Sequence, residues 1–179
     1  MDGTTTIYAY EKVMVLAIKK MKYQFASEIA KELAVLCILN IRKLPFYSGS
    51  NYILVPIPTH KKRKNWRGFN QSEVMGKLIS EKMGWKYSPD LLIKKKATNP
   101  QTELKGKERK INIRGGFVIN SHYSSFDIHN PIILFDDVLT TGSTLKEACK
   151  VLKSSLPVYA GRRRQGKENI KVWGLTVAK

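Results

Sequence analysis

The sequence contains few residues of the kinds that hold metal clusters or cross-link secreted proteins. Among its 179 residues there are only two cysteines, Cys37 and Cys149, and three histidines. Both cysteines fall in apolar patterns with helical spacing, so we expect buried free thiols rather than a disulfide framework. That usage favours a reducing, cytoplasmic location. So small and scattered a set of sulfur and imidazole ligands also argues against a zinc site.

Long apolar runs are missing as well. The longest extends only from Leu33 to Leu39, far short of the roughly 20 residues that a helix needs to cross a bilayer. The first residues show no charged segment followed by an apolar one, the pattern of a secretory signal. We therefore expect a chain without membrane insertion, folded as one domain over residues 1–179.

Acidic residues are scarce relative to basic ones. The chain has 14 Asp and Glu against 32 Lys and Arg, which gives a formal net charge of +18. Such a balance favours polyanionic partners, namely nucleic acid, phosphorylated metabolites or an anionic membrane. A lysine-rich composition that serves only solubility would give the same count. The local motifs must therefore show whether the charge serves a polyanionic partner.

The most informative motif occupies residues 132–144. Four apolar residues predict a buried strand over 131–135 that ends at Asp136 and Asp137, and a turn of Thr, Gly and Ser leads into a helix over 145–153. Ligands of open α/β sheets bind at the carboxyl ends of strands, and helix N-termini attract anions. The two carboxylates can accept hydrogen bonds from a sugar diol or bind Mg²⁺ through water. The alternative is an acidic strand end followed by an ordinary helix cap.

A basic motif follows the strand expected over residues 52–58. Five cations lie between Lys61 and Arg67, and a helix is expected over residues 71–83. We interpret residues 61–67 as a basic loop in which Lys61, Lys62 and Arg67 bind a pyrophosphate. Trp66 among these cations suits stacking on single-stranded bases. The alternative is a solvated basic turn that its aromatic residues anchor, and we expect Phe69 to pack before the helix in this way.

Two further basic segments are candidates for function. Residues 95–116 are polar and rich in glycine and lysine, so we expect a mobile lid over a reacting phosphate, with Arg109 as its candidate catalytic residue. A surface loop is the alternative. Arg162, Arg163 and Arg164 lie between two glycines and form either a nucleic-acid contact or the solvated tip of a hairpin.

Predicted strands and helices alternate along the chain. Helices are expected over residues 10–22 and 25–41, and further strands over 91–93, 116–119 and 172–177. This order predicts an α/β fold with a mainly parallel sheet flanked by helices.

The motifs resemble those of known families. Residues 132–144 closely resemble the phosphoribosyl pyrophosphate (PRPP) motif of type I phosphoribosyltransferases. Residues 56–58, the Arg-Gly-Phe-Asn-Gln segment at 67–71, residues 99–117 and the closing residues 173–179 look like the ComF family. Lys22-Tyr23 matches that family's opening, and the likeness runs from about Ile7 onward. ComF proteins are phosphoribosyltransferase-like and are linked to natural competence and DNA uptake.

The resemblance implies a type I phosphoribosyltransferase fold in which Asp136 and Asp137 hold the ribose hydroxyls. It implies a cradle for the 5′-phosphate made of Thr140, Thr141, Gly142, Ser143 and Thr144. PRPP, Mg²⁺ and single-stranded DNA are the implied ligands, and a homodimer is compatible with the family. The alternatives are a nucleobase or amine phosphoribosyltransferase of salvage metabolism and a PRPP-sensing regulator.

Two departures from the ComF pattern stand out. ComF proteins commonly begin with a four-cysteine zinc ribbon, whereas this sequence has two cysteines in all and shows no such ribbon. Residues 156–171 replace a short helix-to-strand link with a longer loop, which holds Arg162, Arg163 and Arg164. Separately, phosphoribosyltransferases that salvage 6-oxopurines carry an aspartate general base where this chain has Thr140, which argues against that activity.

Overall fold

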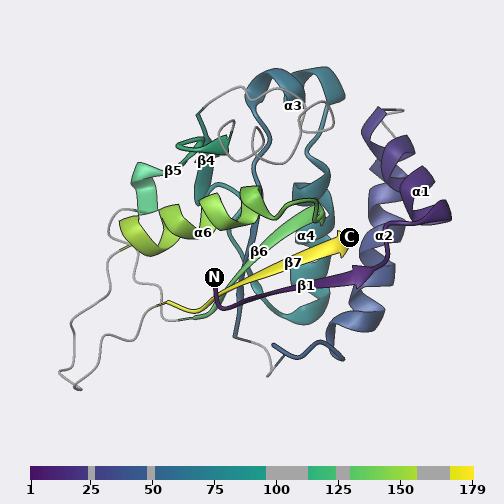
Figure 1. The fold of residues 1–179 in the computed structure, drawn as a ribbon, viewed down its shortest axis with the longest axis horizontal. Coiled ribbons are helices and arrows are strands. Elements are labelled where there is room, and N and C mark those ends of the chain that lie inside the picture. Colours follow the sequence, from purple (N-terminus) through teal and green to yellow (C-terminus); the bar gives the residue numbers. More distant parts are fainter. Residues whose placement is uncertain (24–26, 48–50, 96–112, 124–129, 157–169) are drawn as a thin grey trace.

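The computed structural model describes residues 1–23, 27–47, 51–95, 113–123, 130–156 and 170–179. Its centre is a five-stranded sheet in the order β1-β7-β6-β2-β3 (Figure 1). The strands are β1 (Gly3–Tyr8), β2 (Ile53–Pro56), β3 (Lys86–Tyr87), β6 (Ile132–Val138) and β7 (Val172–Ala178). Each neighbouring pair is parallel. The predicted α/β class with a mainly parallel sheet is therefore confirmed.

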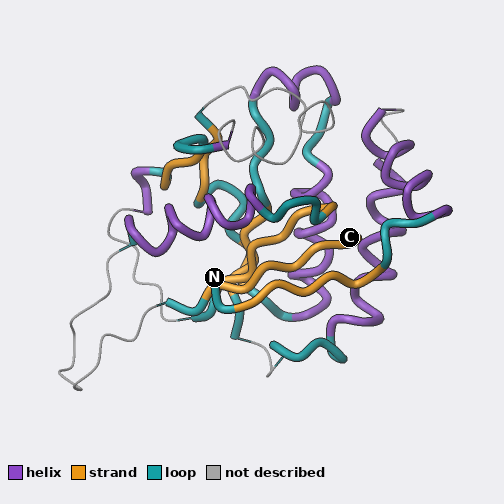
Figure 2. Tube along the Cα trace, viewed as in Figure 1, coloured by secondary structure: helices purple, strands orange, loops and turns teal. Residues whose placement is uncertain are grey.

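Helices cover both faces of the sheet (Figure 2). On one face lie α1 (Lys12–Tyr23), α2 (Ser27–Ile41) and α4 (Gln71–Met83), and α6 (Ser143–Ser155) covers the other. Strand β6 serves both cores because its side chains alternate. Ile133 and Phe135 pack with the first helix group, and Ile132 and Leu134 pack with α6.

A small second sheet lies beside α6. It is an antiparallel pair of β4 (Leu92–Lys94) and β5 (Phe117–Ile119), followed by a short 3₁₀ helix at Ser121–Tyr123. Phe117 is buried with residues of α6, so the pair is packed onto the domain. None of the helices within the described residues combines the length and apolar character that a bilayer crossing requires.

The basic segment after β2 is not the predicted loop. Residues Lys61–Arg67 form the short helix α3, which His60 caps by accepting a hydrogen bond from the Lys62 N–H at 3.3 Å. Gly68 ends the helix in the left-handed conformation, with φ of 78°. The prediction was wrong because the long side chains of Lys and Arg are good helix formers, and the charge run concealed the two caps.

Further predictions from the sequence concern the bounds of elements, the cysteines and the basic segments. The helix over 71–83 has the predicted bounds, and β6 continues through both acids to Val138. Cys37 and Cys149 are free and buried, as predicted. Burial raises the pKa of the Cys37 thiol to about 12. The expected lid, including Arg109, and the Arg162–164 cluster lie outside the described residues.

Candidate functional site

The acid pair lies at the carboxyl end of β6, where the neighbouring strand β2 has already ended. Pro56 of β2 pairs with Phe135, and the chain then leaves the sheet toward α3. Asp136 is half-buried and Asp137 is buried. The N-terminus of α4 meets both carboxylates: Ser72 Oγ lies 3.3 Å from Asp136 Oδ1, and Gln71 Nε2 lies 3.2 Å from Asp137 Oδ2. Two motifs far apart in the sequence thus form one site.

Asp137 is held by an ion pair from the N-terminal helix. Lys22 Nζ, on the last turn of α1, lies 2.7 Å from Asp137 Oδ2, and only 7% of the Asp137 side chain is exposed. Burial alone would raise the pKa of this carboxyl, but the charges of Lys22 and Arg67 and the hydrogen bonds from Lys22 and Gln71 lower it. Asp137 is therefore a fixed negative charge.

Asp136 has a different environment. Its Oδ1 accepts hydrogen bonds from Ser72 and from the Asp137 N–H, the latter at 2.9 Å. Burial and the neighbouring Asp137 raise the pKa of Asp136 to about 7, against the opposing effect of Lys22. Among the described residues, no group donates a hydrogen bond to its Oδ2. With respect to these residues, Oδ2 can therefore accept a hydrogen bond from a ligand.

Asn70 ties the end of β2 to the start of α4. Its Oδ1 accepts from the Ser72 N–H at 3.1 Å, and its Nδ2 donates to the Ile57 carbonyl at 3.1 Å and to Glu73 Oε1 at 3.2 Å. Through the bond from the Ser72 N–H, Asn70 acts as the N-cap residue of α4. This network fixes Gln71 and Ser72 against the acids.

Arg67 closes the site from the end of α3. It is 9% exposed, its guanidinium lies 5.8 Å from the Tyr23 ring centroid, and Nη1 donates to Gln71 Oε1 at 3.4 Å. Burial and the nearby Arg63 lower the Arg67 pKa, whereas Asp137 raises it. Its Nε is a buried donor without a hydrogen-bond partner among the described residues. A buried donor of this kind is suited to an anionic ligand.

The Thr/Gly/Ser turn connects the acid pair to the N-terminus of α6. Gly142 adopts a φ of 69°, which glycine takes without strain because it has no Cβ atom. Thr140 and Thr141 are exposed, and Thr141 Oγ1 lies 2.9 Å from Ser143 Oγ. Ser143 is buried and Thr144 is half-buried. The hydroxyls of Thr141 and Ser143 therefore lie at the N-terminus of α6, where helix N–H groups can attract an anion.

The remaining predicted ligands lie further out. Lys61 and Lys62 are exposed on the first turn of α3, and no contact joins either of them to the acid pair within the described residues. Trp66, on the same helix, is 59% exposed. The structure therefore brings Arg67 to the acids and leaves the two lysines at the surface.

The sequence analysis did not predict four residues of the site as ligands: Lys22, Gln71, Ser72 and Lys94. The Lys94 ammonium, on β4, lies 5.7 Å from the Phe117 ring centroid. Burial, and then the charge of Arg63, lower the pKa of Lys94 to about 8, while Asp136 opposes this shift. Gln71 closes the Arg-Gly-Phe-Asn-Gln motif and Ser72 follows it directly, so this motif is the signal that would have found both.

Charges at the site favour a ligand with several negative groups. Lys22, Arg63, Arg67 and Lys94 act electrostatically on one another or on the two acids. Among the described residues, no three His, Cys, Asp or Glu side chains form a metal-binding group. Two carboxylates suit Mg²⁺ that arrives with phosphate oxygens, since this ion keeps most of its water and rarely uses an all-protein cage.

The chain is similar in sequence to several known proteins. No family model matches the chain. It is 31% identical to "Competence protein F" of Haemophilus influenzae over 188 residues, which cover 99% of this chain and 73% of that protein. It is 26% identical to "DNA utilization protein YhgH" of Escherichia coli over 172 residues (95% and 70%). It is also 26% identical to "Competence protein ComFC" of Bacillus subtilis over 147 residues (82% and 56%).

Solved structures that match include two adenine phosphoribosyltransferases. The enzyme from Leishmania donovani has a TM-score of 0.40 and 14% identity, with 89% of this chain and 68% of that chain covered. The enzyme from Trypanosoma brucei, solved with AMP, pyrophosphate and ribose-5-phosphate, has a TM-score of 0.41 and 14% identity (84% and 64%). Scores this low carry no functional argument.

Proposed function

Because the chain belongs to the ComF family of competence proteins, we propose that it binds PRPP with Mg²⁺ at the acid site and single-stranded DNA at its basic surface. The family is phosphoribosyltransferase-like, and several relatives are named for competence or DNA utilization. The observation that carries the PRPP assignment is the acid pair, which lies between the N-termini of α4 and α6 among an excess of cations.

In this proposal, each part of PRPP would meet different residues of the site. The ribose hydroxyls would donate to the free oxygen of Asp136 and to the carboxylate of Asp137. The 5′-phosphate would lie in the turn from Thr140 to Thr144, where N–H and hydroxyl donors converge. The pyrophosphate would meet Arg67, whose buried Nε has no partner among the described residues, with Lys61 and Lys62 as outer cations.

If the site is catalytic, the reaction class is transfer of ribose 5-phosphate from PRPP to a nucleophile, with release of pyrophosphate. Negative charge then grows on the departing pyrophosphate, and Arg67 would stabilise it. Positive charge grows on the sugar, and the two carboxylates would stabilise it through the ribose hydroxyls. Mg²⁺, when bound with the substrate, supplies further positive charge at the pyrophosphate.

Single-stranded DNA is the second ligand in this proposal. The chain carries a net charge of +18, and Trp66 presents an exposed ring beside the exposed Lys61 and Lys62 of α3. Stacking on aromatic side chains and contacts from cations to phosphates bind single strands with little dependence on base sequence.

The direct test of PRPP binding is calorimetric titration of the wild-type chain. PRPP with excess Mg²⁺ should bind, and the affinity should fall when a chelator removes the metal, since the carboxylates would then face the phosphates without a bridging cation. Ribose 5-phosphate and pyrophosphate, each alone, should bind more weakly than PRPP because each fills only part of the site. No heat of binding with PRPP and Mg²⁺ would contradict the proposal.

A further inference from the structure

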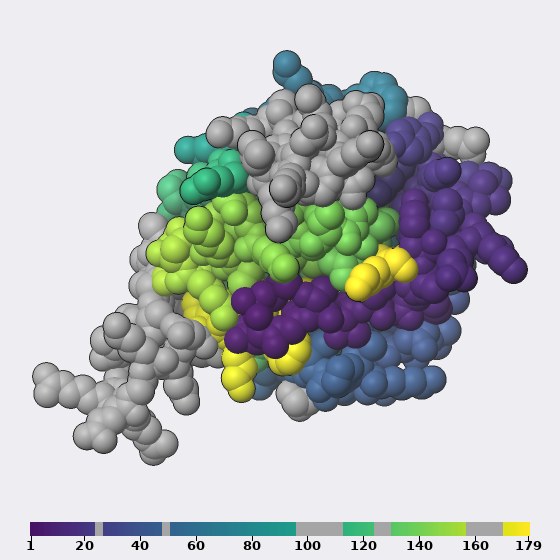
Figure 3. Space-filling view, viewed as in Figure 1, coloured from purple at the N-terminus to yellow at the C-terminus, as the bar shows by residue number. Residues whose placement is uncertain are grey.

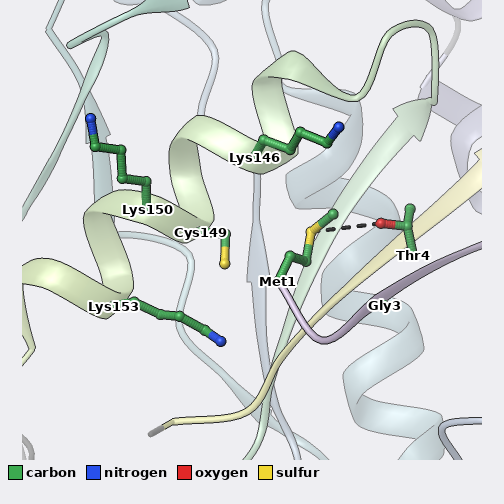
Figure 4. A pocket seen from close by; sticks show the side chains of 7 residues that line it. All are labelled: Met1, Gly3, Thr4, Lys146, Cys149, Lys150 and Lys153. Atoms are coloured by element: carbon green, nitrogen blue, oxygen red, sulfur yellow. Dashed lines mark hydrogen bonds between the residues drawn. The ribbon is translucent and has the colours of Figure 1, made fainter.

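A groove separate from the acid site runs between α6 and the N-terminal segment. It encloses about 390 Å³ and is lined by Met1, Gly3, Thr4, Lys146, Cys149, Lys150 and Lys153 (Figure 4). We call it the α6 groove. In Figure 4, Lys146 and Lys153 extend from the helix to either side of Met1, and Lys150 extends in another direction. Figure 3 shows α6 at the surface, with the N-terminal residues beside it.

The charge of the α6 groove is positive and largely uncompensated. Lys146 and Lys150 are exposed, and neither has an acidic partner within the described residues. Lys153 pairs with Asp2 at 2.9 Å, and Asp2 also accepts from the Val172 N–H at 2.7 Å. Glu147 accepts a hydrogen bond from the Gly115 N–H instead, at 2.8 Å.

The spacing of the lysines suits an extended anion. Positions 146, 150 and 153 follow the repeat that places side chains on one side of a helix, with rises of about 6 Å and 4.5 Å between them. The row starts in the first turn of α6, next to the candidate phosphate turn, and runs away from it. A chain of phosphates could therefore follow the helix.

We propose that the α6 groove binds the sugar–phosphate backbone of single-stranded nucleic acid. The inference rests on the proposed function in taking single-stranded DNA as the ligand, and it adds the place where the strand lies. Exposed lysines act as point charges and read no bases, and the described residues that line the groove include no arginine, whose fork would fix one small phosphate compound. Three lysines spaced along α6, two of which extend to either side of Met1, fit an extended backbone instead.

Salt-dependent binding of a labelled oligothymidine, measured by fluorescence anisotropy, tests this inference. The variant K146Q/K150Q removes the two unpaired charges of the groove. The control K77Q/K82Q removes two exposed lysines from α4, on the opposite face of the sheet. If both groove lysines contact phosphates, the log–log salt slope should flatten by up to about 1.4 in the groove variant, at about 0.7 per phosphate. The control should keep the wild-type slope.

Several outcomes would overturn the inference. It fails if the two variants change the slope equally, if neither changes it, or if the wild-type chain binds no oligonucleotide at low salt. Displacement of the oligonucleotide by polyglutamate at equal charge concentration would assign the groove to acidic protein segments instead. Calorimetry with PRPP and Mg²⁺ on the same variants separates the two sites: unchanged PRPP binding with a flattened slope supports the groove, whatever becomes of the acid site.

Discussion

At the scale of single residues, the surroundings of Asp136 and Asp137 shift the pKa values of the two carboxyls in opposite directions. Asp137 is buried and paired with Lys22, so its pKa falls, whereas that of Asp136 rises to about 7. A fixed charge thus lies beside a carboxyl whose Oδ2 accepts no hydrogen bond from the described residues. From the sequence alone the two acids were assigned the same role, because nothing in it indicates that the fold brings Lys22 of α1 to Asp137.

We predict that Lys22→Met destabilises the chain through Asp137. The change leaves a buried carboxylate without its ion pair, which should cost roughly 1.5–3 kcal/mol of unfolding free energy in urea titrations. The control Lys20→Met, at an exposed position of the same helix, should be near neutral. Adding Asp137→Asn to Lys22→Met should restore most of the loss. Additive losses in the double variant would contradict a direct coupling.

We also predict that Asp136 makes the ligand-free protein less stable as pH rises. Its folded-state pKa of about 7 lies above the unfolded value near 3.9, so the native state binds more protons between these values. The stability from the protonated carboxyl is complete below about pH 4 and is lost as pH approaches about 7. Asp136→Asn should remove this loss, so its unfolding free energy should exceed the wild-type value more at about pH 8 than at about pH 5. A difference independent of pH would contradict the prediction.

At the scale of elements, short sequence patterns predicted those helices and strands whose formation depends on residues near one another in the chain. The helix over 71–83 was predicted with its bounds from its amphipathic pattern, and in the structure Asn70 and Gly84 cap its two ends. Strand β1 was missed because its Thr-rich sequence has no apolar alternation. It forms by parallel pairing with β7, where Thr6 Oγ1 lies 3.0 Å from Thr176 Oγ1. Such a strand depends on residues from the other end of the chain.

For the candidate site, too, the sequence predicted contiguous motifs but not the residues that tertiary packing brings to them. The acid pair, the turn and the basic motif were predicted because each is a contiguous segment with its own chemistry. Their meeting depends on β2 lying beside β6, which places the start of α4 against Asp136 and Asp137. Lys22 and Lys94 could not be assigned from sequence, because each comes from an element whose place in the site is set by tertiary packing.

At the scale of the whole molecule, positive charge is arranged in two different ways. Around the acid site, cations lie close to carboxylates and are partly buried, an arrangement that suits one compact ligand with several phosphates. Along α6, exposed lysines form an open row that suits a long, flexible polyanion. The net charge of +18 would speed the approach of both ligands.

The proposed function depends on the acid pair of β6, at which we propose that the chain binds PRPP. The most direct measurement is the affinity of the Asp136→Asn/Asp137→Asn variant for PRPP with Mg²⁺ by calorimetry. The control is Glu32→Gln/Glu81→Gln, which neutralises two exposed acids on α2 and α4. Losing charge-assisted hydrogen bonds should cost roughly 1.5–3 kcal/mol each, so binding should disappear in the acid-pair variant and persist in the control. Unchanged affinity in a folded acid-pair variant would contradict the account.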